Sequence, residues 1–90
     1  MKGALWMKVY IVMAKAYTID GLGHIKRMVM ADVLNVFNFY DDAVEYIEEN
    51  WPEAKQYGHK YCEDVKWVFG PNKDFSWQAV YKIVEKEIEP

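Results

Sequence analysis

His59 and Cys62 are the residues whose types and spacing come closest to a chemical motif. They stand three positions apart, Glu63 and Asp64 follow directly, and His24 lies far away in the chain. A structural zinc site needs four ligands, usually supplied as two close pairs, and this segment supplies one pair. A reactive thiolate needs an electropositive setting, which the two carboxylates oppose. We therefore expect a loop histidine and an unreactive thiol here, without a metal ion or other cofactor.

Other segments fall short of a catalytic or nucleotide-binding pattern. Gly21 and Gly23 flank a single leucine, whereas a dinucleotide fingerprint needs three spaced glycines and a phosphate-binding loop needs Gly-Lys-Ser/Thr. Acidic residues are frequent in 41–53, but general acid–base catalysis needs carboxyls in a cleft rather than on an outer helix face. We expect a protein that is not an enzyme. The alternative is a small accessory enzyme or metal-dependent protein that uses residues 57–64.

Length and composition bound the class of protein. The 90 residues predict one domain, 1–90, and Met7-Lys8-Val9-Tyr10 reads like a natural start, so residues 1–6 are interpreted as an upstream extension. Hydrophobic residues reach 52%, which excludes a disordered chain. The single cysteine, Cys62, favours a reducing, cytoplasmic compartment. No apolar run approaches the ~20 residues of a membrane span, so we expect no membrane partner.

Two apolar segments in the first half predict a β-hairpin. Residues 5–17 alternate as in a strand, and residues 25–37 form a second, β-branched run. Asp20 and the glycine after it supply turn chemistry, because glycine adopts positive φ and aspartate bonds its own backbone. The second run is long for a strand, which predicts a bulge near Asp32 or Asn35.

One amphipathic helix is predicted after the hairpin. Asn38 is the expected N-cap, and Pro52 ends the helix because the residue before proline disfavours the α region. The apolar side has helical spacing and consists of Tyr40, Ala43, Val44, Ile47 and Trp51. Residues 53–64 read as a connection with a short helical turn, followed by strands 65–69 and 75–88. The order β-β-α-β-β predicts an α+β domain, a mainly antiparallel four-stranded sheet with one amphipathic helix on one face.

Three short segments together span most of the chain. They are Met7-Lys8-Val9-Tyr10-Ile11-Val12, then Val36-Phe37-Asn38 leading to Ala43-Val44-Glu45-Tyr46-Ile47, and Tyr81-Lys82-Ile83-Val84-Glu85-Lys86-Glu87. These segments resemble the opening strand, acidic helix and closing strand of a loose group of small uncharacterised phage and prophage proteins. The resemblance implies the same fold and a phage-derived origin. Because the group has no known activity, the resemblance implies no functional residue.

Acidic side chains dominate the outer face of the predicted helix. Glu48 and Glu49 lie near its C-terminus, where the helix dipole disfavours negative charge, so stability alone would favour lysines there. A solvated face is the simpler interpretation. The functional interpretation is a docking face for a basic protein partner, since complementary charge raises association rate and specificity. Its expected contact residues are Asp41, Asp42, Glu45, Glu48 and Glu49.

Both faces of the predicted sheet carry apolar residues, and one helix covers only one face. Tyr10 and Val12 on the first strand, and Val80 and Val84 on the last, are the expected contact residues of the open face. Large contiguous apolar patches on a surface usually mark contact sites. A homodimer through the open sheet face or an edge strand would bury these side chains.

Charge is unevenly distributed along the sequence. Residues 1–39 carry five basic and two acidic side chains, whereas residues 40–64 carry eight acidic and two basic ones. The net charge of −3 argues against nucleic acid as a partner. The alternative is a weak nucleic-acid binder that uses Lys8, Lys15, Lys26 and Arg27. The sequence thus favours a non-enzymatic protein–protein interaction module, phage-derived, that binds a host or self partner.

Overall fold

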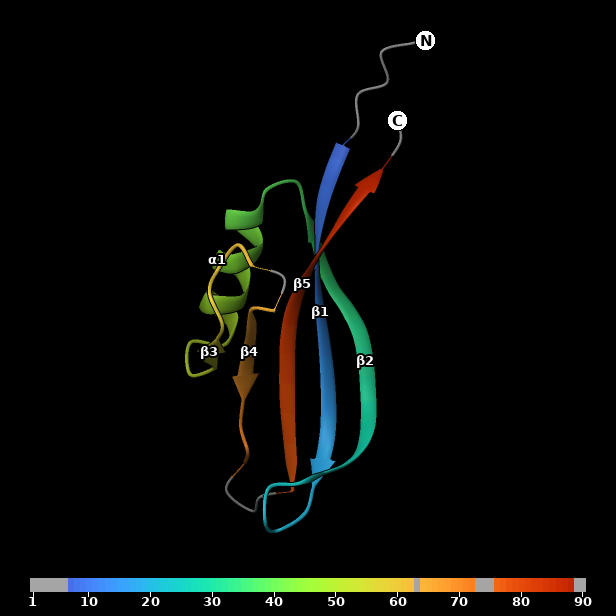
Figure 1. Ribbon diagram of the computed structural model, residues 1–90, viewed down its shortest axis with the longest axis vertical. Coiled ribbons are helices and arrows are strands. Elements are labelled where there is room, and N and C mark those ends of the chain that lie inside the picture. Colours follow the sequence, from blue (N-terminus) through green and yellow to red (C-terminus); the bar gives the residue numbers. More distant parts are fainter. Residues whose placement is uncertain (1–6, 63, 73–75, 89–90) are drawn as a thin grey trace.

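The computed structural model describes residues 7–62, 64–72 and 76–88 (Figure 1). They form β1 (Met7–Ile19), β2 (Ile25–Phe37), α1 (Tyr40–Asn50), β3 (Lys55–Tyr57), β4 (Lys66–Phe69) and β5 (Trp77–Ile88). The strands make one sheet in the order β2-β1-β5-β4-β3, and every neighbouring pair is antiparallel. The protein is therefore a small α+β domain with one helix in its described residues, as the sequence predicts.

The turn between β1 and β2 is organised by one carboxylate. Asp20 Oδ1 accepts hydrogen bonds from the backbone N–H groups of Leu22 at 2.8 Å and His24 at 2.9 Å. These bonds, that from His24 first, lower the pKa of Asp20. Gly23 has φ 84°, a conformation that glycine adopts without a steric cost. The predicted aspartate–glycine turn is confirmed.

Strand β2 is bulged three times against β1. The register skips Lys26, Val29 and Leu34, each of which has no partner on β1. The bulge at Leu34 lies between Asp32 and Asn35, as predicted from the length of the run. Each extra residue adds local twist, so β2 bends away from a flat ladder.

The hydrophobic core lies between α1 and one face of the sheet. The buried helix residues Ala43, Val44 and Ile47 pack against a cluster from the strands and from the residue before β4. That cluster consists of Val12, Ala14, Val65, Trp67, Ala79 and Tyr81. Trp51, at the end of α1, stacks on Tyr81 with ring centroids 4.1 Å apart. The apolar side predicted for the helix is the side that packs here, because its spacing of three and four residues places it on one stripe.

Three expectations about local structure were wrong. The connection after α1 holds a fifth strand, β3, where a helical turn was expected, because its three residues extend the sheet beside β4. Phe39, with extended backbone at φ −127° and ψ 139°, takes the N-cap position expected of Asn38, and no side chain caps the helix. Strand β1 runs two residues further than predicted, to Ile19; the expected positions 5, 6 and 75 lie outside the described residues.

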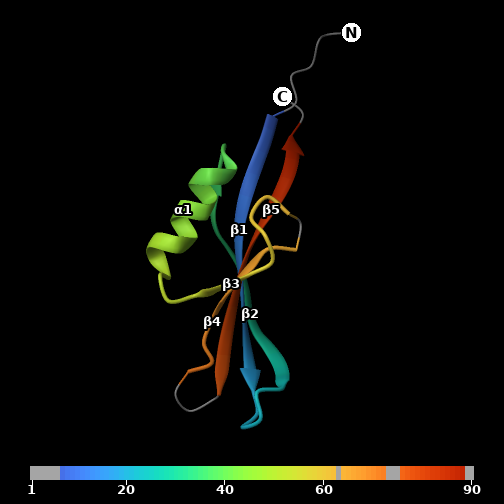
Figure 2. The same ribbon diagram turned by 60° about the vertical axis from the view of Figure 1, so that its left-hand side comes forward.

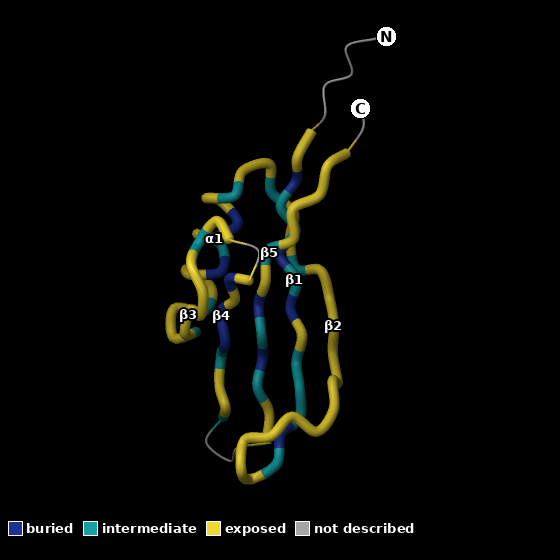
Figure 3. Tube along the Cα trace, viewed as in Figure 1, coloured by how far each residue is buried: buried dark blue, intermediate teal, exposed yellow. Residues whose placement is uncertain are grey.

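Helix α1 covers only part of one face of the sheet. In Figures 1 and 2 it lies beside the end of the sheet near the two termini, and the β1–β2 hairpin extends beyond it. Figure 3 shows β2 exposed along almost its whole length. Every residue from Gly21 to Val33 is exposed, so the turn and this part of β2 have no covering element among the described residues.

Candidate functional site

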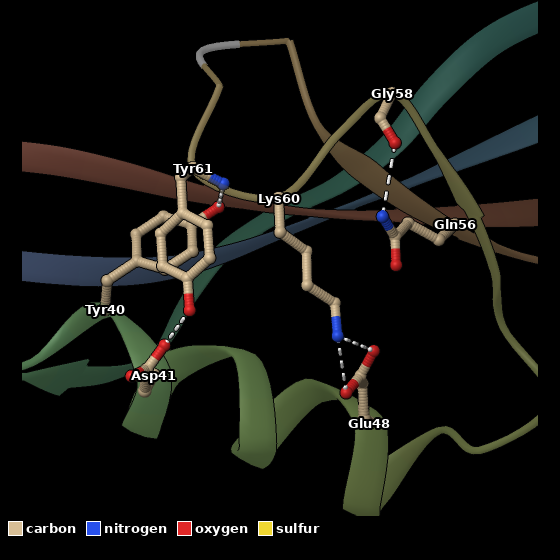
Figure 4. Close-up of polar contacts among 7 residues, drawn as sticks. All are labelled: Tyr40, Asp41, Glu48, Gln56, Gly58, Lys60 and Tyr61. Atoms are coloured by element: carbon tan, nitrogen blue, oxygen red, sulfur yellow. Dashed lines mark hydrogen bonds and ion pairs between the residues drawn. The ribbon is translucent and has the colours of Figure 1, made fainter.

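Two acidic residues of α1 hold the loop between β3 and β4 (Figure 4). The Tyr61 hydroxyl donates a hydrogen bond to the Asp41 carboxylate, and Lys60 Nζ lies 3.0 Å from Glu48 Oε2. The Tyr61 backbone N–H also donates to the Tyr40 hydroxyl at 3.0 Å. The bond to Asp41 raises the pKa of Tyr61, because the carboxylate stabilises the protonated phenol. Asp41 and Glu48 therefore have intramolecular partners, which gives both a structural role.

The other expected acidic contact residues have no hydrogen bond or ion pair with the described part of this loop. Asp42, Glu45 and Glu49 are exposed on α1. Repulsion from the Glu49 carboxylate, four residues along the helix, is the first cause of a raised pKa at Glu45. All five expected acidic contact residues are exposed, and Asp42, Glu45 and Glu49 have no ion pair in the described part of the chain.

His59 and Cys62 lie on the same loop, and both are exposed. Cys62 and Tyr61 line a cavity of about 520 Å³ together with Tyr10, Tyr40 and residues of β5. His24 lies in the β1–β2 turn, where its Nδ1 is 3.3 Å from Asp20 Oδ2. Within the described ranges, no three of the histidine, cysteine, aspartate and glutamate side chains gather in an arrangement that could hold a metal ion.

The sheet face opposite α1 is basic. Strand pairing places Lys66 directly beside Lys82, because Trp67 pairs with Tyr81 and the strands are antiparallel. Lys15, paired with Val80, lies on the same face. The register adds one lysine from β3 and one near the end of β5. We call Lys15, Lys55, Lys66, Lys82 and Lys86 the lysine face.

The lysine face has no acidic residue among the described strand positions that point to it. None of its lysines lies within ion-pair distance of a carboxylate of the described residues. The cross-strand pair Lys66–Lys82 is unfavourable, since like charges directly opposite each other destabilise a sheet. Folding stability therefore gives no reason for this charge distribution.

A groove of about 360 Å³ crosses the lysine face. Its apolar floor consists of residues from β1 and β5 with Ile25 at one end, and Tyr17 contributes an aromatic ring. Three ammonium groups line it, those of Lys15, Lys66 and Lys82. The groove can therefore bind an anionic ligand that has a flat apolar part.

The second unusual surface is the outer strand β2, which pairs with no further strand among the described residues. Six of its large apolar side chains are 44–60% exposed over both faces, whereas Leu34 and Phe37 pack against the core. We call Ile25, Met28, Val29, Met30, Val33 and Val36 the β2 edge. The backbone N–H groups of Val33 and Val36 are already bonded to the side chains of Asp32 and Asn35, which leaves residues 25–32 as the part of β2 for pairing with another strand.

Only half of the apolar contact residues expected from the sequence lie on the open face. Val80 and Val84 are there, in the groove. Val12 is wholly buried in the core and Tyr10 packs against it, so placing these two on the open face was wrong. Alternation assigned each residue to one of two faces, but both faces are apolar, and the pattern gave no sign of which one the helix covers. Sequence reasoning missed Lys66 and Lys82 as site residues. Strand pairing places them on the same face as Lys15, and the sequence alone does not reveal this pairing.

No protein-family model, curated protein or solved structure matches this chain. None of the helical segments in the described ranges has the length and apolar character needed to cross a lipid bilayer.

Proposed function

We propose that the protein is a non-enzymatic interaction module that binds a second copy of itself through the β2 edge. The observation that carries this proposal is a 13-residue outer strand without one buried residue. Isolated monomers rarely expose contiguous apolar patches above about 300–600 Å². A second β2 is the simplest cover, because an exposed strand edge pairs readily with another strand.

The exposed side chains favour the segment from Ile25 to Met30 as the centre of the contact. Leu22 in the adjoining turn is 82% exposed, and Ile25 is 60% exposed. The bulges in β2 limit a regular ladder, so side-chain burial is expected to contribute more to the contact than backbone pairing. A symmetric dimer uses the same patch on both copies, which suits a strand that is apolar on both faces.

Oligomeric state tests this proposal. We expect light scattering after size-exclusion chromatography to give a dimer mass that falls toward the monomer on dilution. Val29→Lys should give a monomer, since an edge lysine blocks strand pairing. Val84→Lys is the matched control: Val84 is 41% exposed and Val29 51%, but Val84 lies on β5. A monomeric wild-type chain at high concentration would overturn the proposal, as would dissociation by Val84→Lys and not by Val29→Lys.

A further inference from the structure

The lysine face supports an inference that does not depend on self-association. We infer that it binds single-stranded nucleic acid, with the phosphates on Lys15, Lys66 and Lys82 and a base on the ring of Tyr17. All four residues line the same groove.

Charge complementarity is the first argument. The net charge of −3 is not spread evenly over the surface, because the acids of α1 lie on the helix side and the lysine face carries only positive charge in the described strands. A polyanion bound to this face would relieve the repulsion between Lys66 and Lys82. Neutralised phosphates release counterions, and this release supplies most of the affinity of a non-specific binder.

The shape of the groove is the second argument. Its floor is apolar, formed by Met13, Val80 and Val84, and the ring of Tyr17 is half-buried beside it. Modules that bind single strands combine a positive groove for the backbone with aromatic rings on which bases stack. In the proposed complex, a base covers the apolar floor of the groove and the Tyr17 ring, and the phosphate of the same nucleotide contacts the groove lysines.

The cations of the groove are all lysines, whose ammonium groups bind phosphate as point charges. An acidic peptide would meet the same charges, so competition with polyglutamate separates the two ligand classes. The single arginine of the chain, Arg27, pairs with Thr18 in the register and does not line the groove.

Two triple variants of equal charge test the inference. One removes the groove lysines (Lys15→Gln, Lys66→Gln and Lys82→Gln), and the other removes cations elsewhere (Lys8→Gln, Lys26→Gln and Arg27→Gln). The probe is a fluorescein-labelled oligouridylate of about 20 nucleotides, longer than the ~4–16 that one small module covers, followed by fluorescence anisotropy. We expect the groove variant to weaken binding roughly tenfold or more and to lower the salt slope by about 2, since each phosphate contact on a single strand contributes ~0.7. The control variant should keep most of the affinity.

Tyr17→Leu separates stacking from charge, because it keeps the apolar surface and removes the ring. We expect it to weaken binding about fivefold, the lower end for base–aromatic stacking, with the salt slope unchanged. The inference is overturned if the wild-type chain does not bind the probe at low salt, or if both triple variants lose affinity equally. It is also overturned if polyglutamate of equal charge displaces the probe as well as unlabelled oligouridylate does, because the ligand class would then be an acidic peptide.

Discussion

Like charges face each other at two places on the surface of this protein. On α1, Glu45 and Glu49 are separated by one helical turn, and on the sheet Lys66 stands opposite Lys82. Either arrangement costs stability relative to a neutral or opposite pair. By contrast, the two acids of α1 that have a partner, Asp41 and Glu48, hold the loop of Tyr61. The contacts with this loop therefore account for two of the acids on α1. No intramolecular contact among the described residues accounts for the lysines of the lysine face.

The carboxylate pair on α1 gives a prediction at the scale of one residue. Glu49→Lys should raise the melting temperature at pH 7 by about 1–3 °C, because repulsion becomes an attractive pair at i, i+4 and a cation then lies in the last turn of the helix. Glu45 has a raised pKa in the folded chain, so the folded state binds more protons and stability falls as pH rises from about 4.5 through that raised pKa. The part of the gain that comes from the pair should therefore be lost as pH falls and Glu45 is protonated, and the part that comes from the helix dipole should remain.

Thermal melts of both chains at a series of pH values measure this effect. Glu53→Lys is the control. It makes the same change of charge as Glu49→Lys, but position 53 lies beyond the end of α1, out of reach of Glu45. An NMR titration of the Glu45 side chain should show its midpoint moving down in Glu49→Lys and staying in place in Glu53→Lys. An equal gain from both lysines would refute pair repulsion as the cause.

At the scale of the element, α1 is held by a narrow apolar stripe. Ile47 has no exposed surface and packs in the core between helix and sheet. Ile47→Ala should lower the free energy of unfolding by about 2–5 kcal/mol, and Ile47→Val by about 0.5–1.5 kcal/mol, since each leaves a cavity in proportion to the atoms removed. Urea denaturation followed by tryptophan fluorescence, at one fixed protein concentration, measures both values.

Ile88→Ala is the matched control for the helix. Ile88 is 43% exposed at the end of β5, so its truncation should change stability by less than about 0.5 kcal/mol. If Ile47→Ala cost no more than Ile88→Ala, α1 would not be anchored to the sheet by this stripe.

The elements differ in how far the sequence could predict them. The helix was predictable because its apolar spacing and Pro52 act locally and agree with each other. Strand β3 was not, because its three residues, Lys55–Tyr57, have no pattern of their own and become a strand only through pairing with β4. The N-cap was missed by one residue: Phe39 takes that position without any side-chain bond, so no polar residue marks it.

At the scale of the whole molecule, charge is sorted by face rather than by segment. The lysine face draws on four strands and on positions from Lys15 to Lys86, so summing charge over stretches of sequence hides it. The net charge hides it as well, because the five acids of α1 offset the five lysines of this face. The groove was therefore beyond the reach of the sequence, since it depends on the order β1-β5-β4 and on which face α1 covers.

The two proposals have a joint geometric consequence. If two copies pair antiparallel through β2, the twofold axis is perpendicular to the sheet, so both lysine faces lie on the same side. Strands are spaced about 4.8 Å apart, so about 14 Å would separate the two β1 strands. One nucleic-acid strand could then contact Lys15 of both copies at once.

This arrangement predicts that affinity depends on oligonucleotide length only in the dimer. For an oligouridylate of about 20 nucleotides, the wild-type chain should bind at least about tenfold more tightly than Val29→Lys, because the second contact is intramolecular and gains from effective concentration. For one of about 5 nucleotides, near the lower limit for one module, the two chains should bind equally. Fluorescence anisotropy with both lengths measures the four affinities, and the short oligonucleotide shows whether the added lysine of Val29→Lys alone changes binding. Equal affinity of wild type and Val29→Lys for the long oligonucleotide would mean that the two lysine faces do not share one strand, even if each proposal holds separately.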